Sequence, residues 1–318
     1  MRMKPLFETT AKRFTTIDNA NVVLLYDTLN LFFSVVLGKV TGMLSTLDGR
    51  PSAQVYSAFQ RIRGHCKKYT KPGQRVALVF AWDNQPKAKQ EIFPEYKMNR
   101  DANQKLDEAD LSFRMGTFQE MLRALPCTFI EAPEEEADDV IATLVASYRK
   151  PTYIMSSDKD LWSLLQNSRV KIVSLRESAV VTDLDLKEKY ALPNRKNAYK
   201  VALYKAVMGD VSDNVPKVPR IPSKAFHEAL NDISYSREDD CVSLLIERAS
   251  RLEKPRAHTL LVEHEALVRR NLLIVTLKEK VDLCAQYNEG AKERLEAIFD
   301  DFECRSITGE GRHEFLYR

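Results

Sequence analysis

Residues 21–27 read NVVLLYD and residues 75–83 read RVALVFAWD, two short and mainly apolar runs that each end in an aspartate. Continuous apolar runs of this length are typical of strands that are buried on both faces of a sheet. Three more runs of this kind follow, at Thr128–Glu131, Thr152–Ser156 and Arg169–Leu175. The sequence therefore predicts a buried sheet with acidic residues where its strands end.

Helical patterns separate the predicted strands. Apolar residues recur at helical spacing over Ala53–Lys68, Leu111–Leu125 and Asp138–Tyr148. Strands that alternate with helices predict an α/β fold with a central parallel sheet, covered by helices on both faces. From about residue 200 onward the patterns favour helix. Residues 84–110 form a long polar insertion that carries lysines, a candidate loop or helical arch.

Acidic residues follow four of the five predicted strands. In a parallel sheet, ligands bind at the edge where the carboxyl ends of the strands meet. Taken singly, each acid suits a helix N-cap or an ordinary turn. Together they would repel one another, and bound cations would relieve that repulsion. The set comprises Asp27, Asp83, Glu134 to Asp139, Asp158 and Asp160, joined by Asp210 and Asp213 from the helical part.

Carboxylate oxygens are the ligands that hard divalent ions prefer. Two such ions about 3.5–4 Å apart can activate a water molecule and stabilise both oxygens of a phosphoryl displacement. The acids therefore favour a site for two Mg²⁺ (or Mn²⁺) ions. Positive charge for a phosphate is present at Lys97 and Arg100, and Tyr96 is available to stack on a base.

The composition argues against other kinds of site. The five cysteines and five histidines are dispersed and form no CxxC pair, which disfavours a zinc site or a disulfide framework and indicates a reducing compartment. The chain has no stretch of about 18 uncharged apolar residues, and its first residues lack the apolar run of a signal peptide. We expect a cytoplasmic monomer without a membrane partner. The net charge of +3 permits a nucleic-acid partner and does not indicate one.

At these residues the sequence resembles the flap endonuclease family of 5′ nucleases, and most closely its phage-encoded flap endonuclease/5′–3′ exonuclease branch. The matching words extend from about residue 21 to residue 277, and their order and spacing make the match specific. They are YDTLN, FAWDN, FPEYKMNRD, EADDVIA, MSSDKDLWSLL, ALYKAVMGDVSDNVP and RRNLLIVTL.

The resemblance implies a role for each acid. The ligands of one ion match Asp27, Asp83, Glu136 and Asp138, with Asp158 shared or nearby. Those of the second ion match Asp158, Asp160, Asp210 and Asp213. Asp139 matches the last acid of the EADD motif and is included in the metal set. Lys97 and Arg100 match residues at the base of a helical arch that contact the scissile phosphate, whereas Lys205 and Lys224 match lysines that bind the DNA backbone.

The chain departs from the family pattern at one hairpin. A Gly-Val-x-Gly-Ile-Gly hairpin is usual there, and its glycines let the backbone approach phosphate or a monovalent ion closely. Here residues 217–223 read KVPRIPS, and proline removes a donor and fixes φ. Lys217, Arg220 and Lys224 are the alternative source of salt-dependent contacts with duplex. An arginine that often follows the first aspartate is also missing, with Ser34 near its expected place.

We therefore expect an enzyme, a divalent-metal-dependent 5′ nuclease that hydrolyses DNA at 5′ ends, flaps or single-strand/duplex junctions, as in replication and repair. RNA in RNA–DNA hybrids stays open as a further substrate. The expected domains are an α/β nuclease core at 20–196 with its arch at about 84–110, a helix–hairpin–helix-like DNA-binding region at 197–290, and a tail at 291–318.

Three other functions are weaker readings of the same residues. An aspartyl-phosphate phosphatase normally has a second aspartate two residues after the first, where this chain has Leu29. A small PIN-type ribonuclease has no reason to carry EYKMNR or the GDVSDN segment. The alternative from another class is a non-catalytic nucleic-acid-binding protein that retains the nuclease fold, and the full set of acids argues against it.

Overall fold

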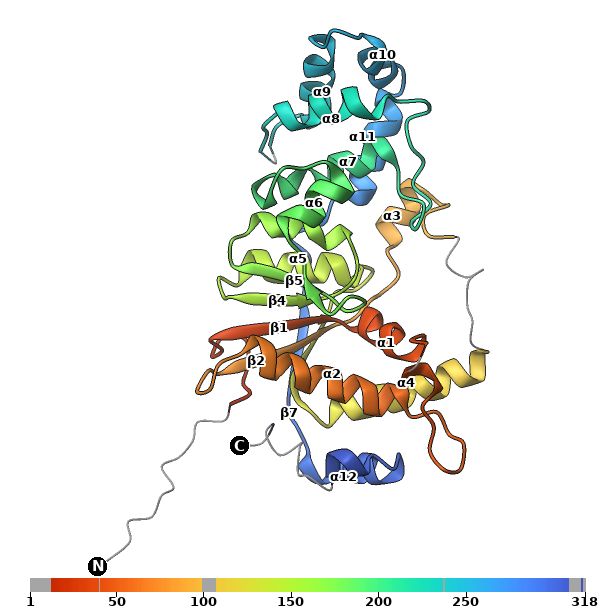
Figure 1. Cartoon of the computed structure of the whole chain (residues 1–318), viewed down its shortest axis with the longest axis vertical. Coiled ribbons are helices and arrows are strands. Elements are labelled where there is room, and N and C mark those ends of the chain that lie inside the picture. Colours follow the sequence, from red (N-terminus) through yellow and green to blue (C-terminus); the bar gives the residue numbers. More distant parts are fainter. Residues whose placement is uncertain (1–12, 40, 99–106, 237, 309–315, 317–318) are drawn as a thin grey trace, which may run out of the picture.

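A seven-stranded sheet crosses the middle of the molecule in the computed structural model, which describes residues 13–39, 41–98, 107–236, 238–308 and 316 (Figure 1). The strand order is β6-β5-β4-β1-β2-β3-β7. The five inner strands run parallel, and the short β6 and the longer β7 pair antiparallel at the two edges. The strands are β1 (Val22–Asp27), β2 (Val76–Ala81), β3 (Pro126–Glu131), β4 (Thr152–Met155), β5 (Val170–Ser174), β6 (Ala179–Val180) and β7 (Cys284–Glu289).

The predicted α/β fold class is confirmed, because the five predicted strands form the parallel centre of this sheet. Alternate residues of β1 enter two separate cores. Val23 and Leu25 pack with helix α5 (Ala137–Ser147) and the C-terminal helices, while Leu24 and Tyr26 pack with helices on the opposite face. Burial on both faces explains why the strands are continuously apolar.

The helices of the opposite face are α1 (Thr28–Val36), α2 (Ala53–Tyr69) and α4 (Glu108–Arg123), and α5 covers the first face together with the 3-10 segment η3 (Asp160–Gln166) (Figure 1). Helix α4 begins inside the predicted insertion of 84–110. That insertion also contains α3 (Lys87–Ile92), and its residues 99–106 lie outside the described part of the chain. A short 3-10 turn, η1 (Thr41–Met43), precedes α2.

Helices gather at one end of the molecule, beyond the sheet (Figure 1). They are α6 (Asp183–Tyr190), η4 (Arg195–Lys200), α7 (Val201–Met208), α8 (Ser223–Asp232), α9 (Cys241–Ser250), α10 (Arg256–Glu263) and α11 (Glu265–Val275). The prediction of helix after residue 200 is thus confirmed as far as α11. Among the described residues, no helix has the length and apolarity that a membrane crossing requires.

Strand β7 is where the prediction of helix was wrong. It pairs antiparallel with β3 along its whole length, from Pro126 opposite Glu289 to Glu131 opposite Cys284. As an edge strand it is mostly exposed, so its sequence CAQYNE carries neither an apolar run nor a clear alternation. The signal that the sequence analysis used for strands was therefore absent.

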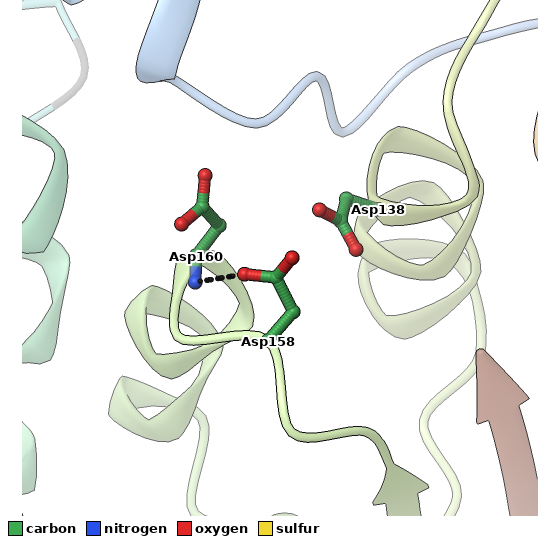
Figure 2. A group of neighbouring side chains, drawn as sticks. All are labelled: Asp138, Asp158 and Asp160. Atoms are coloured by element: carbon green, nitrogen blue, oxygen red, sulfur yellow. Dashed lines mark hydrogen bonds between the residues drawn. The ribbon is translucent and has the colours of Figure 1, made fainter. Parts of the chain in front are cut away.

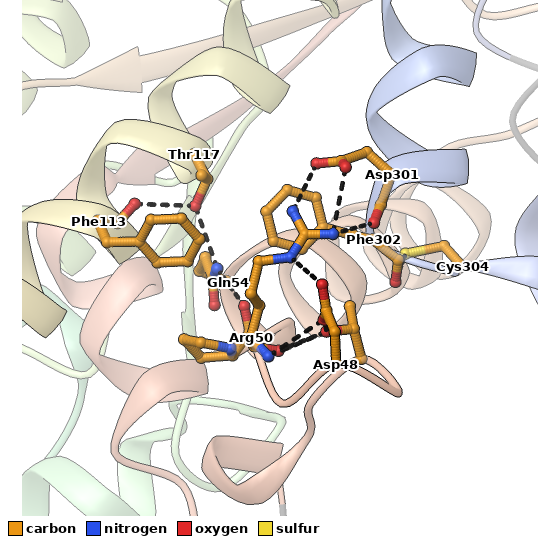
Figure 3. Close-up of polar contacts among 10 residues, drawn as sticks. Asp48, Arg50, Gln54, Phe113, Thr117, Asp301, Phe302 and Cys304 are labelled. Carbon is orange, nitrogen blue, oxygen red and sulfur yellow. Dashed lines mark hydrogen bonds and ion pairs between the residues drawn. The ribbon is translucent and has the colours of Figure 1, made fainter.

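The residues after β7 pack against the sheet's second face. Helix α12 (Lys292–Asp301) places Phe299 against Phe59 of α2, with ring centroids 4.7 Å apart. Arg50, in the loop before α2, donates to the backbone oxygen of Asp301 at 2.9 Å and pairs with its carboxylate at 3.0 Å (Figure 3). Helix α13 (Arg305–Thr308) follows. The described part of the expected tail therefore shares the core beneath α2.

Candidate metal centre

Two of the predicted acids follow neighbouring strands and are fixed by backbone amides. Asp27 ends β1 and caps α1, so its Oδ1 accepts from the backbone nitrogen of Asn30 at 3.0 Å. Asp83 lies two residues beyond β2, and its Oδ1 accepts from the backbone nitrogen of Ala137 at 2.8 Å. The capping role considered from sequence is thus present at Asp27, the N-cap of α1, and Asp83 similarly accepts from the first residue of α5.

Two groups of three carboxylates are close enough to share a cation. The first triad, Asp138, Asp158 and Asp160, has ligand atoms within 4.8 Å of one another, and so has the second triad, Asp160, Asp210 and Asp213. In Figure 2, Asp138 faces the other two from the start of α5. Because Asp160 belongs to both triads, their acids form one continuous group, which we call the acidic edge. All donors are carboxylate oxygens, which suits Mg²⁺ or Mn²⁺.

Burial makes this edge unfavourable for negative charge unless a cation is bound. It raises the pKa of Asp27 to about 7, with smaller contributions from the charges of Asp158 and Asp83. It also raises the pKa of Asp138, and Asp158 and Asp27 add to that shift. These mutual effects place Asp27, Asp83, Asp138 and Asp158 in one electrostatic neighbourhood, as the sequence predicts.

Glu136 is engaged by cations from the insertion. It is 2% exposed, and its Oε2 lies 2.7 Å from the ammonium of Lys89 and accepts from the Tyr96 hydroxyl at 3.0 Å. Its Oε1 contacts the ammonium of Lys97. Burial alone would raise the pKa of Glu136, but Lys89 and Lys97 lower it to about 2. Its role as a metal ligand stays a prediction, and that role requires Lys97 to move.

Asp139 has partners of its own, and its assignment to the metal set stays a prediction. Successive residues of a helix point about 100° apart, so Asp139 points in a different direction from its neighbour Asp138. It is fully buried, pairs with Lys89 at 2.8 Å, and accepts from the backbone nitrogen of Lys278 at 2.8 Å. Its carboxylate therefore joins α5 to the insertion and to the segment after α11.

Two residues predicted to contact nucleic acid turn inward instead. Tyr96 is 4% exposed within the core, so its ring is not available to stack on a base. Lys205 is 5% exposed, and its ammonium contacts the carboxylates of Asp160 and Asp210. The prediction for Tyr96 was wrong because sequence gives the type of side chain and not its direction. Contact of Lys205 with the DNA backbone stays a prediction.

The remaining basic candidates differ in what the structure says of them. Lys217, Arg220 and Lys224 are exposed in the loop between α7 and α8 and at the start of α8. Their contacts with duplex stay a prediction. Lys97 lies beside the acidic edge, on Glu136. Arg100 falls outside the described residues.

Hydrogen bonds link the insertion to the loop that carries the second triad. The backbone nitrogen of Lys97 donates to the backbone oxygen of Asp213 at 3.2 Å, and the side-chain amide of Asn214 donates to the backbone oxygen of Glu95 at 2.8 Å. The loop turns sharply at Gly209, whose φ is 74° and where a Cβ would lie 2.7 Å from the backbone of Lys217. The base of the insertion is therefore held beside both triads.

Several supporting residues were missed by the sequence analysis. Ser156 donates to Oδ2 of Asp27 at 2.8 Å and accepts from the backbone nitrogen of Asp158 at 3.0 Å, so it couples two strand ends. Its place in the word MSSDKD was the one available signal. Lys89 had none, since a lysine in a polar insertion is usually solvated. Arg61 of α2 donates to Ser34 at 2.6 Å, beside the place where the family's arginine was expected.

A parallel α/β sheet whose carboxyl edge gathers carboxylates from four segments of chain, beside an insertion that carries Lys89 and Lys97, is the arrangement expected of a metal-dependent 5′ nuclease. A family model described as "5′-3′ exonuclease, N-terminal resolvase-like domain" matches residues 22–191, more than half of the chain. The chain belongs to this 5′-3′ exonuclease family.

Two curated relatives have a similar sequence. DNA polymerase I of Caldicellulosiruptor bescii is 30% identical over 278 residues, which cover 83% of this chain and 30% of the polymerase. The 5′-3′ exonuclease of Buchnera aphidicola is 29% identical over 195 residues, which cover 60% of this chain and 64% of that protein. The chain thus spans less than two thirds of the length of either relative.

Solved structures share the fold. T5 5′-exonuclease with bound divalent zinc ions has a TM-score of 0.58 at 20% identity, covering 89% of this chain and 98% of its own. The flap endonuclease of bacteriophage T5, in a complex with DNA and metal ions, has a TM-score of 0.57 at 18% identity, covering 93% and 96%. This likeness shows that the predicted fold is the one that the phage enzyme has.

Proposed function

We propose that the chain is a 5′ nuclease that uses two divalent ions, Mg²⁺ or Mn²⁺, to hydrolyse DNA at 5′ ends, flaps or single-strand/duplex junctions. The observation that carries the proposal is the pair of carboxylate triads that share Asp160. Two adjacent ions can activate the attacking water and stabilise both oxygens of an in-line phosphoryl displacement. Membership of the 5′-3′ exonuclease family supports the direction of attack.

The residues of the acidic edge would either hold the ions or orient the groups that hold them. When bound, the ions would supply an activated water and neutralise charge on the phosphate. The first triad would hold one ion and the second triad the other. Asn30 and Ser156 keep Asp27 in one orientation through their hydrogen bonds, as outer partners of metal ligands commonly do.

Lys97 and Arg100 are proposed to contact the scissile phosphate. The ammonium of Lys97 lies 5.0 Å from the centre of the Tyr96 ring and contacts the carboxylate of Glu136, beside the acidic edge. Movement of its ammonium from Glu136 to an incoming phosphate would free a carboxylate oxygen for an ion. Substrate and cation would then each favour the binding of the other.

The proposed partner is DNA with a 5′ single-stranded end or flap, with RNA of RNA–DNA hybrids as a further substrate and a monomer as the active form. In this proposal residues 20–196 form the nuclease core and residues 197–290 grip duplex. Lys217, Arg220 and Lys224 would contact its phosphates, because they are exposed in and just after the loop that carries Asp210 and Asp213.

A labelled 5′-flap duplex tests the proposal. Wild-type protein should shorten the labelled strand in Mg²⁺ and leave it intact in EDTA. Asp158→Asn should be at least about 100-fold slower, since the loss of an outer partner of a metal already costs about 10–100-fold. The control is Asp300→Asn, at an exposed position of α12, which should cut like wild type. Cleavage by Asp158→Asn at the wild-type rate would contradict the metal assignment. A retarded, uncut band with wild type in both Mg²⁺ and EDTA would favour the non-catalytic nucleic-acid-binding protein.

A further inference from the structure

A lysine lies inside the second triad. Lys205 belongs to the last turn of α7, and its ammonium is 2.6 Å from Oδ2 of Asp210 and also contacts Oδ1 of Asp160. The side chains involved are well shielded, with exposures of 7% for Lys205, 12% for Asp160 and 14% for Asp210. The ammonium thus stands between carboxylates that the proposed function assigns to the second ion.

The first triad differs in this respect. Neither Asp138 nor Asp158 forms an ion pair with a lysine or arginine in the part of the chain that the structure describes. Asp160 alone connects the first triad to the ammonium of Lys205. The two triads have the same kind of ligand and the same number of carboxylates, but the second contains an ammonium in contact with two of its members, whereas Lys97 acts on Asp138 only from a longer range.

We propose that Lys205 is a built-in counter-ion of the second triad, and that a second divalent ion binds there only when it displaces this ammonium. The inference rests on the proposed function. Three shielded carboxylates repel one another, and one ammonium relieves part of that repulsion in the absence of metal. An ammonium and a divalent ion within a few ångströms repel strongly at low dielectric, so they compete for the same oxygens.

This competition has two consequences. The first triad fills at lower metal concentration than the second, so the ions bind in order. In addition, the protein without metal does not leave the second triad uncompensated, because the lysine stays in place. A purely structural ion pair would contribute to stability in the same way, and it would not set the affinity for a second ion.

Calorimetric titration of the whole chain with Mn²⁺, without DNA, separates these roles. Wild type should show a tight and a weak class of sites. Lys205→Met should tighten the weak class by about ten-fold or more, since it removes a competing positive charge, and should change the tight class much less, because the first triad meets this lysine only through Asp160. Lys205→Arg, which keeps the charge, should leave the weak class weak.

The matched control is Lys200→Met. Lys200 is 2% exposed at the start of α7, and its ammonium donates to the backbone oxygen of Asn231 at 3.1 Å, a neutral partner. This variant removes a buried lysine without touching the triad, so both classes should keep their wild-type affinities. If Lys205→Met does not fold in EDTA, the same affinities are measured by withdrawing Mn²⁺ from the loaded protein with a competing chelator.

The outcomes distinguish this inference from the proposed function. A weak class that stays unchanged or weakens further in Lys205→Met overturns the counter-ion role and leaves the metal centre in place. Wild type that binds no Mn²⁺ at all overturns both. A second readout is unfolding in EDTA, where Lys205→Met should be less stable than wild type and should gain more stability from Mn²⁺.

Discussion

Asp27 caps helix α1 and faces the acidic edge, so one carboxyl group takes part both in the fold and in the proposed metal centre. Its oxygens are held by Asn30 and Ser156, and its neighbours are other acids. Folding thus places a carboxyl group where its charge is unfavourable until a cation arrives. The same holds for Asp138, in the first turn of α5.

This arrangement predicts how stability depends on pH when metal is absent. Burial raises the pKa of Asp27 to about 7 from the ordinary 3.8, so between these values the folded state holds a proton that the unfolded state has lost. Stability in EDTA should therefore fall as pH rises from about 4 to about 7, by an amount on the order of 1–4 kcal/mol. Asp27→Asn should reduce the fall, and the part due to Asp138 should remain.

Urea unfolding in EDTA at several pH values between 4 and 8 measures this dependence. With excess Mn²⁺ the fall should shrink, because the ion stabilises the ionised form. Equal pH dependence of wild type and Asp27→Asn would show that this carboxyl group is not perturbed in the way described.

Lys89 provides a second prediction at the scale of single residues. Its ammonium neutralises Glu136 and Asp139, and all three are buried. Lys89→Met should cost about 3–5 kcal/mol, since it leaves buried carboxylates without a partner. Lys87→Met is the control, because its pair with Glu134 lies in solvent and contributes little. Chemical unfolding of the two variants tests this, and equal stabilities would contradict the buried network.

How much of the site could be predicted from sequence depends on whether the sheet or the side-chain contacts place a residue. The position of Asp27, Asp83 and Asp158 could be predicted, because a residue that follows a buried strand is placed by the sheet itself. The direction of Tyr96 and Lys205 could not, because nothing in the order of residues says whether a side chain in a polar segment turns inward. Only tertiary contacts decide that.

At the scale of elements, β7 closes the sheet on the β3 side and leads into α12. Its pairing depends on a sharp turn at Gly290, where φ is 81° and a Cβ would lie 2.8 Å from the backbone nitrogen of Pro126. The parallel strands could be predicted from their apolar runs, whereas an exposed edge strand has no such run. Its place is set by the partner strand and by this glycine.

Gly290→Ala should therefore destabilise the protein by about 2–4 kcal/mol, from left-handed backbone strain and a close backbone contact. Gly73→Ala is the matched control. Gly73 has a φ of 77° and nothing within 4 Å of its Cβ position, so that variant should lose only the strain, about 1–2 kcal/mol. Thermal or urea unfolding compares the two variants. Equal losses of stability would mean that the backbone around Gly290 shifts to accept a Cβ without an energetic cost.

At the scale of the whole molecule, the acidic edge lies between the sheet and the C-terminal helices. Hydrogen bonds from Lys97 to Asp213 and from Asn214 to Glu95 connect the insertion to the helical part. The exposed Lys217, Arg220 and Lys224 belong to that part, so a duplex held there would extend from the proposed catalytic residues.

Binding of flap DNA should therefore depend on salt through these three side chains. Replacing all three with alanine should reduce the slope of log K against log salt by about 3, since each phosphate contact contributes about 0.9. The matched control removes Lys67, Lys71 and Arg75, which are exposed near the opposite, amino edge of the sheet. Fluorescence anisotropy in the Asp158→Asn background gives both slopes, and equal slopes would place the duplex elsewhere.

Diffraction from a crystal soaked in Mn²⁺ tests the central claim most directly, because the anomalous signal locates the ions without reference to activity. We expect one peak among Asp138, Asp158 and Asp160, and at higher Mn²⁺ a second peak among Asp160, Asp210 and Asp213 with the ammonium of Lys205 moved away. Ordered carboxylates in both triads without any peak, at millimolar Mn²⁺, would contradict it.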